Sequence, residues 1–411
     1  MGQRISRRPS WEHYSLLITA VIHLFLPMQW GDDAWFFTRA AAVDLPTFLS
    51  TSSRLFVDST TYLFATWPML WRLLNPLVLF GLYWLFTRLL GTTSQRQNIC
   101  IGLGVVLLSM ALVDAGFMAT TINYLWPTTF ALFLIYSLLH FVPHQKVSWL
   151  RIALCVPALF YAMNMQQMAL VLPALLAALL LLQVLKNKQV GKSIATAVFL
   201  VCALAGAAFS FFQSTGGEAS RLVRESARYF PDFASLSILQ RAELGFSSTM
   251  HGLSASLSIP AALFLLFCVF LVIMAFRQSA RRHVKVASLL PITVTTTLLC
   301  LQAQLPLVNY GMRHASYLFS PVTFAAFVLL ACATAFAVFL LLSPQDRLLA
   351  FYVLGLGVGS RILMGFSPTV WASGVRTFYL LLLSMLFVGY QIYRNMKENT
   401  HEPHHPCKKT L

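Results

Sequence analysis

The amino-acid sequence predicts an all-α, polytopic membrane protein, and three observations lead to this prediction. Apolar residues make up 58% of the 411 residues and charged residues only 10%, whereas an average soluble domain carries about 25% charged residues. The mean hydropathy is +0.72. Apolar runs of roughly 17 to 25 residues, the length that crosses a bilayer as a helix, recur along the whole chain. Together these observations exclude a mainly soluble protein.

Hydropathy predicts about twelve membrane-spanning helices. They form a single transmembrane domain over residues 1–393, followed by a cytoplasmic tail at 394–411. The first span follows three arginines but is not followed by a small-x-small cleavage site, so we expect an uncleaved helix and not a signal peptide. The approximate ranges of the spans are 14–30, 69–90, 98–113, 125–142, 150–165, 166–185, 193–212, 258–276, 286–303, 318–342, 348–366 and 375–393.

The charged residues predict the orientation of the chain, because Lys and Arg near span ends are retained on the cytoplasmic side. An N-terminus in the cytoplasm places most Lys and Arg residues there and most Asp and Glu residues outside. The net charge of +16 therefore reflects a basic cytoplasmic rim and does not indicate nucleic-acid binding. Two long outer loops, at about 31–68 and 213–257, are expected to carry interfacial helices. Any chemistry is expected on this outer face.

An acidic pair, Asp32 and Asp33, directly follows the first span and stands between Trp30 and Trp35. Two adjacent carboxylates at a membrane boundary are partly desolvated and repel one another, which raises the proton affinity of one of them. Such a group suits a general base or a metal ligand. The alternative is that the pair only caps the helix that follows, since aspartate is favoured at helix N-termini.

Two polar segments on the outer side are candidates for binding a sugar. Segment 114–127 is too apolar for an exposed loop and too broken for the middle of a helix, and irregular backbone at membrane depth lines a cavity or is buried in protein. Its candidate ligands are Asn123, Tyr124 and Trp126, with Trp126 stacking on a sugar ring; an interfacial aromatic anchor is the alternative. The turn at 163–167 adds the amides of Asn164 and Gln166, which equally suit the capping of helix ends.

Arginines near the outer ends of the spans are candidates for anion binding, because a guanidinium group offers paired donors to phosphate oxygens. Arg361 lies about one turn inside a span, where a charge is costly and suggests a functional partner. For Arg376, snorkelling to the membrane surface is the alternative. The candidates for a phosphate site are Arg54, Arg313, Arg361 and Arg376.

The order of these features resembles that of the bacterial polytopic glycosyltransferases of the GT-C class, and more narrowly of the phage-type O-antigen glucosyltransferase-like membrane proteins. The resemblance rests on the acidic pair, on Asn123-Tyr124-Leu125-Trp126-Pro127, and on Ser367-Pro368 followed by Arg376. It covers the whole chain in topology. The chain departs from the pattern at 163–167, where related sequences often carry a glutamate and this one carries amides.

The resemblance implies a hexosyltransferase of the bacterial inner membrane with an active site that faces the periplasm or exterior. Its donor would be a sugar on a polyprenyl phosphate, and its acceptor a cell-surface glycan, such as lipopolysaccharide O-antigen, or a lipid-linked glycan. Asp32 or Asp33 would deprotonate the acceptor hydroxyl, and the four arginines would hold the donor phosphate. Arginines or a divalent metal, Mg²⁺ or Mn²⁺, would stabilise the charge on the leaving phosphate.

Two other functions compete with this one. A secondary transporter or flippase-type carrier fits twelve spans, but a transporter is expected to show repeat symmetry and polar residues at mid-span, whereas the charges here cluster at the outer edge. An O-antigen polymerase would also be polytopic. Arg241 and Gly252 fit an arginine-to-glycine spacing associated with such enzymes, but a match of this kind is expected by chance. No nucleotide-binding motif is found.

Overall fold

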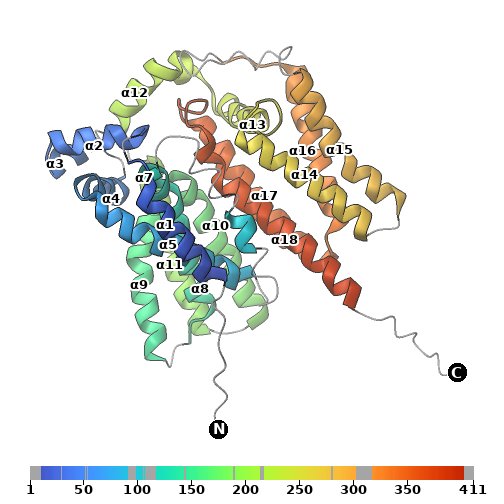
Figure 1. Ribbon diagram of the computed structural model, residues 1–411, viewed down its shortest axis with the longest axis horizontal. Helices are drawn as coiled ribbons and strands as arrows, with labels where there is room; N and C mark the ends of the chain where they lie inside the picture. Colours follow the sequence, from blue (N-terminus) through green and yellow to red (C-terminus); the bar gives the residue numbers. More distant parts are fainter. Residues whose placement is uncertain are drawn as a thin grey trace, which may run out of the picture. The chain divides into compact units, whose positions relative to one another are not determined.

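The computed structural model describes residues 11–28, 30–50, 52, 54–90, 99–104, 106, 117–142, 145–187, 190–212, 217–278, 281–301 and 317–401. These ranges contain helices and no strand, which confirms the all-α class. Ten of the described helices are long and apolar enough to cross a membrane, as predicted for a polytopic membrane protein (Figure 1). The first predicted span is the shorter helix α1, and part of the predicted 98–113 span lies outside the described residues.

The chain divides into two compact units where the sequence predicts one domain. Unit 1 comprises Met1–Ala234 and Ser367–Tyr379, and unit 2 comprises Ser235–Phe366 and Leu380–Leu411. The helices of unit 1 are α1 (Trp11–Phe25), α2 (Asp32–Ala42), α3 (Leu45–Leu49), α4 (Leu55–Thr66), α5 (Pro68–Leu90), α7 (Phe117–Thr120), η2 (Thr121–Leu125), α8 (Trp126–Leu139), α9 (Lys146–Met163), α10 (Gln166–Leu182), η3 (Gln183–Asn187), α11 (Val190–Phe212), α12 (Gly217–Tyr229), η4 (Pro231–Ser235) and η8 (Val375–Phe378).

Unit 2 is built mainly from long apolar helices. Their N-termini are set by local sequence: Ser320 accepts a hydrogen bond from the amide of Thr323 ahead of α16, and Ser237 and Gln240 form a reciprocal capping box at the start of α13. The helices are α13 (Ile238–Ser254), α14 (Ile259–Gln278), α15 (Arg282–Leu301), α16 (Pro321–Leu341), α17 (Pro344–Ile362), η7 (Leu363–Phe366) and α18 (Tyr379–His401).

The expectation of broken backbone at 114–127 is wrong for its described part. Residues 117–139 form one continuous span in which α7 passes into the π-helical turn η2 and then into α8. At the Phe117 end of the described span, the carboxylate of Asp33 accepts hydrogen bonds from the amides of Met118 and Ala119, as a capping group does. A carboxylate distant in sequence therefore takes the place of a local capping residue.

The segment 31–68, predicted as an outer loop, contains three short helices, α2, α3 and α4, which lie together at one end of the unit 1 bundle (Figure 1). Several of their aromatic side chains remain exposed, among them Trp35 at 54% and Phe56 at 49%. Short helices with exposed aromatic groups next to membrane spans are typical of the membrane interface.

Charges are distributed unevenly along unit 1. Asp32, Asp33, Asp44 and Asp58 belong to α2–α4 or their caps. The opposite ends of the spans carry basic residues: Arg88 in the last turn of α5, Lys146 in the first turn of α9, and Lys192 near the start of α11. Lys192 near the start of α11 donates to the carbonyl of Leu139 at the end of α8, as expected for antiparallel neighbours. Ser210 near the end of α11 donates to the carbonyl of Met163 at the end of α9, so α9 and α11 run parallel. Unit 1 thus has a basic end and an opposite end where aspartates gather together with Arg39 and Arg54; we call the latter the acidic end after its aspartates.

Candidate functional site

Asp33 lies at the centre of the acidic end of unit 1. Its side chain is fully buried, and its two oxygens accept hydrogen bonds of 2.9 and 2.7 Å from the amides of Met118 and Ala119. Burial raises the pKa of the Asp33 carboxyl to about 6, while these backbone hydrogen bonds oppose the rise and the neighbouring Asp32 adds to it. Asp33 therefore caps a helix, although not the helix that follows it in the sequence.

Asp32 is oriented differently. Its side chain is 45% exposed and forms an ion pair of 2.5 Å with Arg376, which is 20% exposed. The sequence predicts both residues as site residues with different roles, and the structure brings them together. The two adjacent carboxylates thus have distinct surroundings: Asp33 binds backbone amides in the interior, and Asp32 binds a guanidinium group at the surface.

The backbone around Arg376 is fixed by its own segment and by α10. Gly374 has φ 63°, a conformation that side chains with a Cβ rarely adopt, and it precedes the short helix η8 that carries Arg376. Arg376 also donates to the carbonyl of Ser373. Gln167 in the first turn of α10 is buried and donates to the carbonyl of Thr377 at 2.9 Å. The sequence-based site prediction names Gln166 and lacks Gln167, because no local pattern indicates which of the two amides contacts the segment that carries Arg376.

Arg54 and Asn123 form a second polar group in unit 1. Arg54 donates to the Oδ1 atom of Asn123 at 2.6 Å, and its guanidinium group also lies 3.7 Å from the carboxylate of Asp58. Asn123 lies in the π-helical turn η2 and donates to the carbonyl of Ala119. Single π-turns inside α-helices occur frequently at functional sites. Asp58, which also accepts from Ser52 at 2.5 Å, is a member of this group that the sequence-based site prediction lacks.

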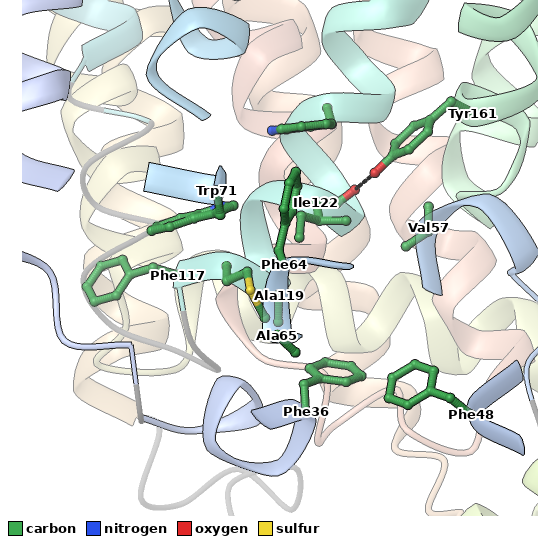
Figure 2. Close-up of a cluster of buried hydrophobic side chains, with 12 residues drawn as sticks. Phe36, Phe48, Val57, Phe64, Ala65, Trp71, Phe117, Ala119, Ile122 and Tyr161 are labelled. Carbon is green, nitrogen blue, oxygen red and sulfur yellow. Dashed lines mark hydrogen bonds between the residues drawn. The ribbon is translucent and has the colours of Figure 1, made fainter. Parts of the chain in front are cut away.

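An apolar cluster holds α2–α4 against α7, η2 and α8 (Figure 2). Phe36 of α2 and Phe48 of α3 pack on one side, and Phe64 of α4 packs edge-on against Trp126 at 5.4 Å. Figure 2 also shows the hydroxyl of Tyr161 directed at the carbonyl of Ile122, at 3.4 Å. This cluster fixes the short helices that carry Asp32, Asp33 and Arg54.

The structure gives Trp126 an interior position. Its side chain is only 7% exposed, and its indole nitrogen donates to Asn75 at 2.8 Å. Asn75 also bonds the ring of His23 at 2.6 Å. The predicted role of Trp126 in stacking on a sugar would require its present ring neighbours, Phe64 and Tyr161, to move. This arrangement favours a packing role.

The remaining predicted sugar ligands lie near the same membrane end of unit 1. Asn164 accepts from the amide of Phe56 at 2.8 Å and donates to the carbonyl of Phe160, so it joins α4 to the end of α9. Gln166 is exposed, and Tyr124 is half-buried. Gln166 and Tyr124 thus keep side-chain surface that a ligand can contact.

The other two predicted phosphate-binding arginines are Arg361 and Arg313. Arg361 belongs to unit 2, where it is buried in the last turn of α17. Arg313 lies outside the described residues. Within the described residues, no three His, Cys, Asp or Glu side chains converge on a point that would hold a metal ion. The role of Mg²⁺ or Mn²⁺ stays a prediction.

At one end of unit 1 the structure thus brings Asp32 together with Arg376, and Arg54 together with Asn123. No protein-family model, no curated protein and no solved structure matches this chain. The functional argument therefore rests on the chemistry of these residues.

Proposed function

We propose that this chain is a membrane glycosyltransferase that transfers a sugar from a polyprenyl-phosphate donor to a cell-surface glycan or a lipid-linked acceptor. The observation that carries the proposal is the ion pair between Asp32 and Arg376 at the acidic end of unit 1. The pair joins the two groups that this reaction needs. A carboxylate accepts a proton from the acceptor hydroxyl, and a guanidinium group binds a phosphate.

We assign the role of general base to Asp32. Both oxygens of Asp33 already accept backbone hydrogen bonds, and its side chain is buried. The side chain of Asp32 is 45% exposed, so a substrate hydroxyl can approach it. Asp33 is then a positioning residue, because it fixes the start of α2 to the start of the Phe117–Leu139 span.

In the proposed reaction, the oxygen of the acceptor hydroxyl attacks the anomeric carbon of the donor sugar, and the bond between this carbon and the phosphate oxygen breaks. The proton of the hydroxyl passes to Asp32. The electron pair of the broken bond stays on the leaving polyprenyl phosphate, whose charge Arg376 stabilises. Binding of the donor phosphate to Arg376 would release the carboxylate of Asp32, which makes the base available only when the donor is present.

Arg54 is the second proposed ligand of the donor phosphate. Its side chain is 27% exposed, and its guanidinium group donates a hydrogen bond of 2.6 Å to Asn123. Tyr124, Asn164 and Gln166 remain the proposed contacts to sugar hydroxyls. Their hydroxyl and amide groups both donate and accept hydrogen bonds, as sugar hydroxyls do.

We further propose that the acidic end of unit 1 faces the periplasm or exterior of a bacterial inner membrane. This orientation is supported by the basic residues at the opposite helix ends, because Lys and Arg near spans are retained in the cytoplasm. In a variant whose own seven cysteines are replaced by serine, Ala42→Cys, at the exposed end of α2, should react with a membrane-impermeant maleimide added to intact spheroplasts. Lys146→Cys should react only after permeabilisation. The reverse pattern would disprove this orientation.

The activity is tested with purified protein in vesicles, a panel of radiolabelled sugars on polyprenyl phosphate, and cell-envelope glycan as acceptor. We expect transfer by the wild type, a loss of roughly 100-fold or more in Asp32→Asn, and weaker apparent donor affinity in Arg376→Ala. Asp232→Asn, an exposed carboxylate of η4, is the matched control and should keep full activity. Absence of transfer from every donor, together with flux of a substrate across the vesicle membrane, would favour a transporter.

A further inference from the structure

Arg72, near the start of α5, binds the C-terminal end of α1. Its guanidinium group donates hydrogen bonds to the carbonyl of His23 and, at 2.9 Å, to the carbonyl of Leu26. His23 lies in the last turn of α1 and Leu26 follows the helix, since α1 ends at Phe25. The last carbonyls of a helix have no partner within it, and a cation near them interacts favourably with the helix dipole. Arg72 therefore fixes the place where the chain leaves α1.

Asn75, about one turn further along α5, binds the side chain of the same histidine. Its amide joins the ring of His23, at 2.6 Å, to the indole nitrogen of Trp126, at 2.8 Å. An indole N–H only donates, so the amide oxygen of Asn75 accepts from Trp126 and the amide nitrogen donates to Nε2 of His23. The other ring nitrogen, Nδ1, then donates to the carbonyl of Thr19 at 2.6 Å, which assigns the Nδ1–H tautomer to His23. The end of α1 is thus bound to α5 through a side chain as well as through its backbone.

The chain that leaves α1 is held a second time at Asp33, whose carboxylate accepts a hydrogen bond from the amide of Met118. The turn that carries this amide is itself bound to α5. The hydroxyl of Thr121 accepts from the indole N–H of Trp71 at 3.1 Å and donates to the carbonyl of Met118 at 3.1 Å. Helix α5 therefore also holds the Asp33 end of the segment, through the turn that Asp33 binds.

These hydrogen bonds hold the segment 26–33 at both ends, and Asp32 lies within this segment. Trp71 and Arg72, which act on the two ends, are adjacent residues of α5. A charged side chain inside the start of an apolar span is costly, which indicates a function for Arg72.

We propose that Arg72 is a positioning residue that, by fixing the end of α1, orients the carboxylate of Asp32 toward Arg376. Without this contact the segment 26–33 is held only at Asp33, and the carboxylate of Asp32 loses its fixed place. The proposal rests on the proposed function, because it concerns the base of that reaction.

The transfer assay in vesicles tests the proposal through kcat and the donor KM. Arg72→Met keeps an apolar stem and removes the guanidinium group. It should lower kcat by roughly 10- to 100-fold and leave the donor KM unchanged, because Arg376 and Arg54 are intact. Arg72→Lys keeps a cation with three N–H donors and should retain most of the activity. Arg88→Met removes the same groups from an exposed arginine at the opposite end of α5 and should keep full activity.

A spin label reports on the end of α1 without any transfer reaction. In a full-length variant whose seven cysteines are replaced by serine, Phe25→Cys carries the label, because this last residue of α1 is 80% exposed. The EPR spectrum should show restricted motion of the label with Arg72 and with Arg72→Lys, and faster motion with Arg72→Met. Monodisperse elution in detergent confirms that each variant is folded. Arg72→Gln, which keeps an amide donor, replaces Arg72→Met if that variant aggregates.

A wild-type kcat in Arg72→Met together with a more mobile label would overturn the proposal, since α1 would then be loosened without an effect on Asp32. An unchanged EPR spectrum would overturn it as well, because Arg72 would not hold the end of α1. A rise of the donor KM alone would show that Arg72 binds the donor instead. Absence of transfer by the wild type from every donor would refute the proposed function and with it the role of Arg72 toward Asp32, while the EPR spectra would still show whether Arg72 fixes α1.

Discussion

The carboxylate of Asp32 accepts a hydrogen bond from the guanidinium group of Arg376, although the two residues stand 344 positions apart in the sequence. A half-exposed ion pair of this kind contributes about 0 to 1 kcal/mol to stability. We therefore predict that Asp32→Asn changes the free energy of unfolding by less than about 1 kcal/mol while it abolishes most of the transfer activity. Thermal unfolding in detergent and the transfer assay measure the two effects on the same preparation. A loss of activity that merely follows a loss of folded protein would contradict the role of Asp32 as base.

The raised pKa of Asp33 predicts a dependence of stability on pH. With a pKa of about 6, Asp33 keeps its proton in the folded protein at pH values where the unfolded chain has lost it. The free energy of unfolding should therefore fall by about 3 kcal/mol as the pH rises from about 4 to about 6, and this contribution should stay constant above that. Other carboxylates titrate in the same range, so the informative quantity is the difference between the wild type and Asp33→Asn. Parallel pH profiles of the two proteins would show that Asp33 does not titrate in this way.

The hydrogen bond from Gln167 to Thr377 predicts different effects at two adjacent glutamines. Gln167→Glu places an ionised carboxylate against the carbonyl oxygen of Thr377 and should lower the free energy of unfolding by about 1 to 3 kcal/mol. Gln166 is exposed, so Gln166→Glu should change it by less than about 0.5 kcal/mol. Acidification should partly restore Gln167→Glu, because a protonated carboxyl group donates a hydrogen bond again. Thermal unfolding at two pH values measures both effects, and equal behaviour of the two variants would contradict the assignment.

Helices α13 and α17 of unit 2 cross closely, so one added methyl group at the crossing should strongly lower the free energy of unfolding. A Cβ atom on Gly245 would lie 2.0 Å from the carbonyl oxygen of Ile362, whereas a Cβ atom on Gly355 would have no neighbour within 4 Å. Gly245→Ala should lower the free energy of unfolding by about 3 kcal/mol. Gly355→Ala, also within a helix, should be neutral or raise it by up to about 1 kcal/mol. Comparison of the two melting temperatures tests the crossing, and a neutral Gly245→Ala would show that α13 and α17 are not in close contact.

The membrane spans could be predicted from the sequence because each depends on a local run of apolar residues. The start of the span at Phe117 could not, since the group that caps it, Asp33, lies far away in the sequence. The sequence allows the acidic pair to cap a helix, but it indicates the helix that begins at Asp32 and not the span at Phe117. Hydropathy alone carries no information on which helix end a distant carboxylate meets.

The candidate site could be predicted in its residue types but not in its pairings. The sequence predicts both Asp32 and Arg376 as charges at a membrane boundary. No sequence pattern near either residue indicates that the two contact one another. Trp126 has the composition of an interfacial aromatic residue, and only the packing of Phe64 and Tyr161 against it reveals its interior position. Gln167 and Gln166 have the same local sequence signal, and the direction of each side chain distinguishes them.

The π-helical turn at Thr121–Leu125 gives the acidic end of unit 1 a dependence on helix phase. Each residue of an α-helix turns the chain by roughly 100°, so a span that contains one wider turn presents different faces before and after it. Asp33 binds the helix before this turn, Arg54 binds Asn123 within it, and Trp126 packs after it. Conversion of this turn to regular α-helix with all its residues kept would rotate either the capped end or the packed end by about a quarter of a turn. The π-helical turn thus changes the direction in which the side chains after it point, so that one helix contacts three partners on different sides.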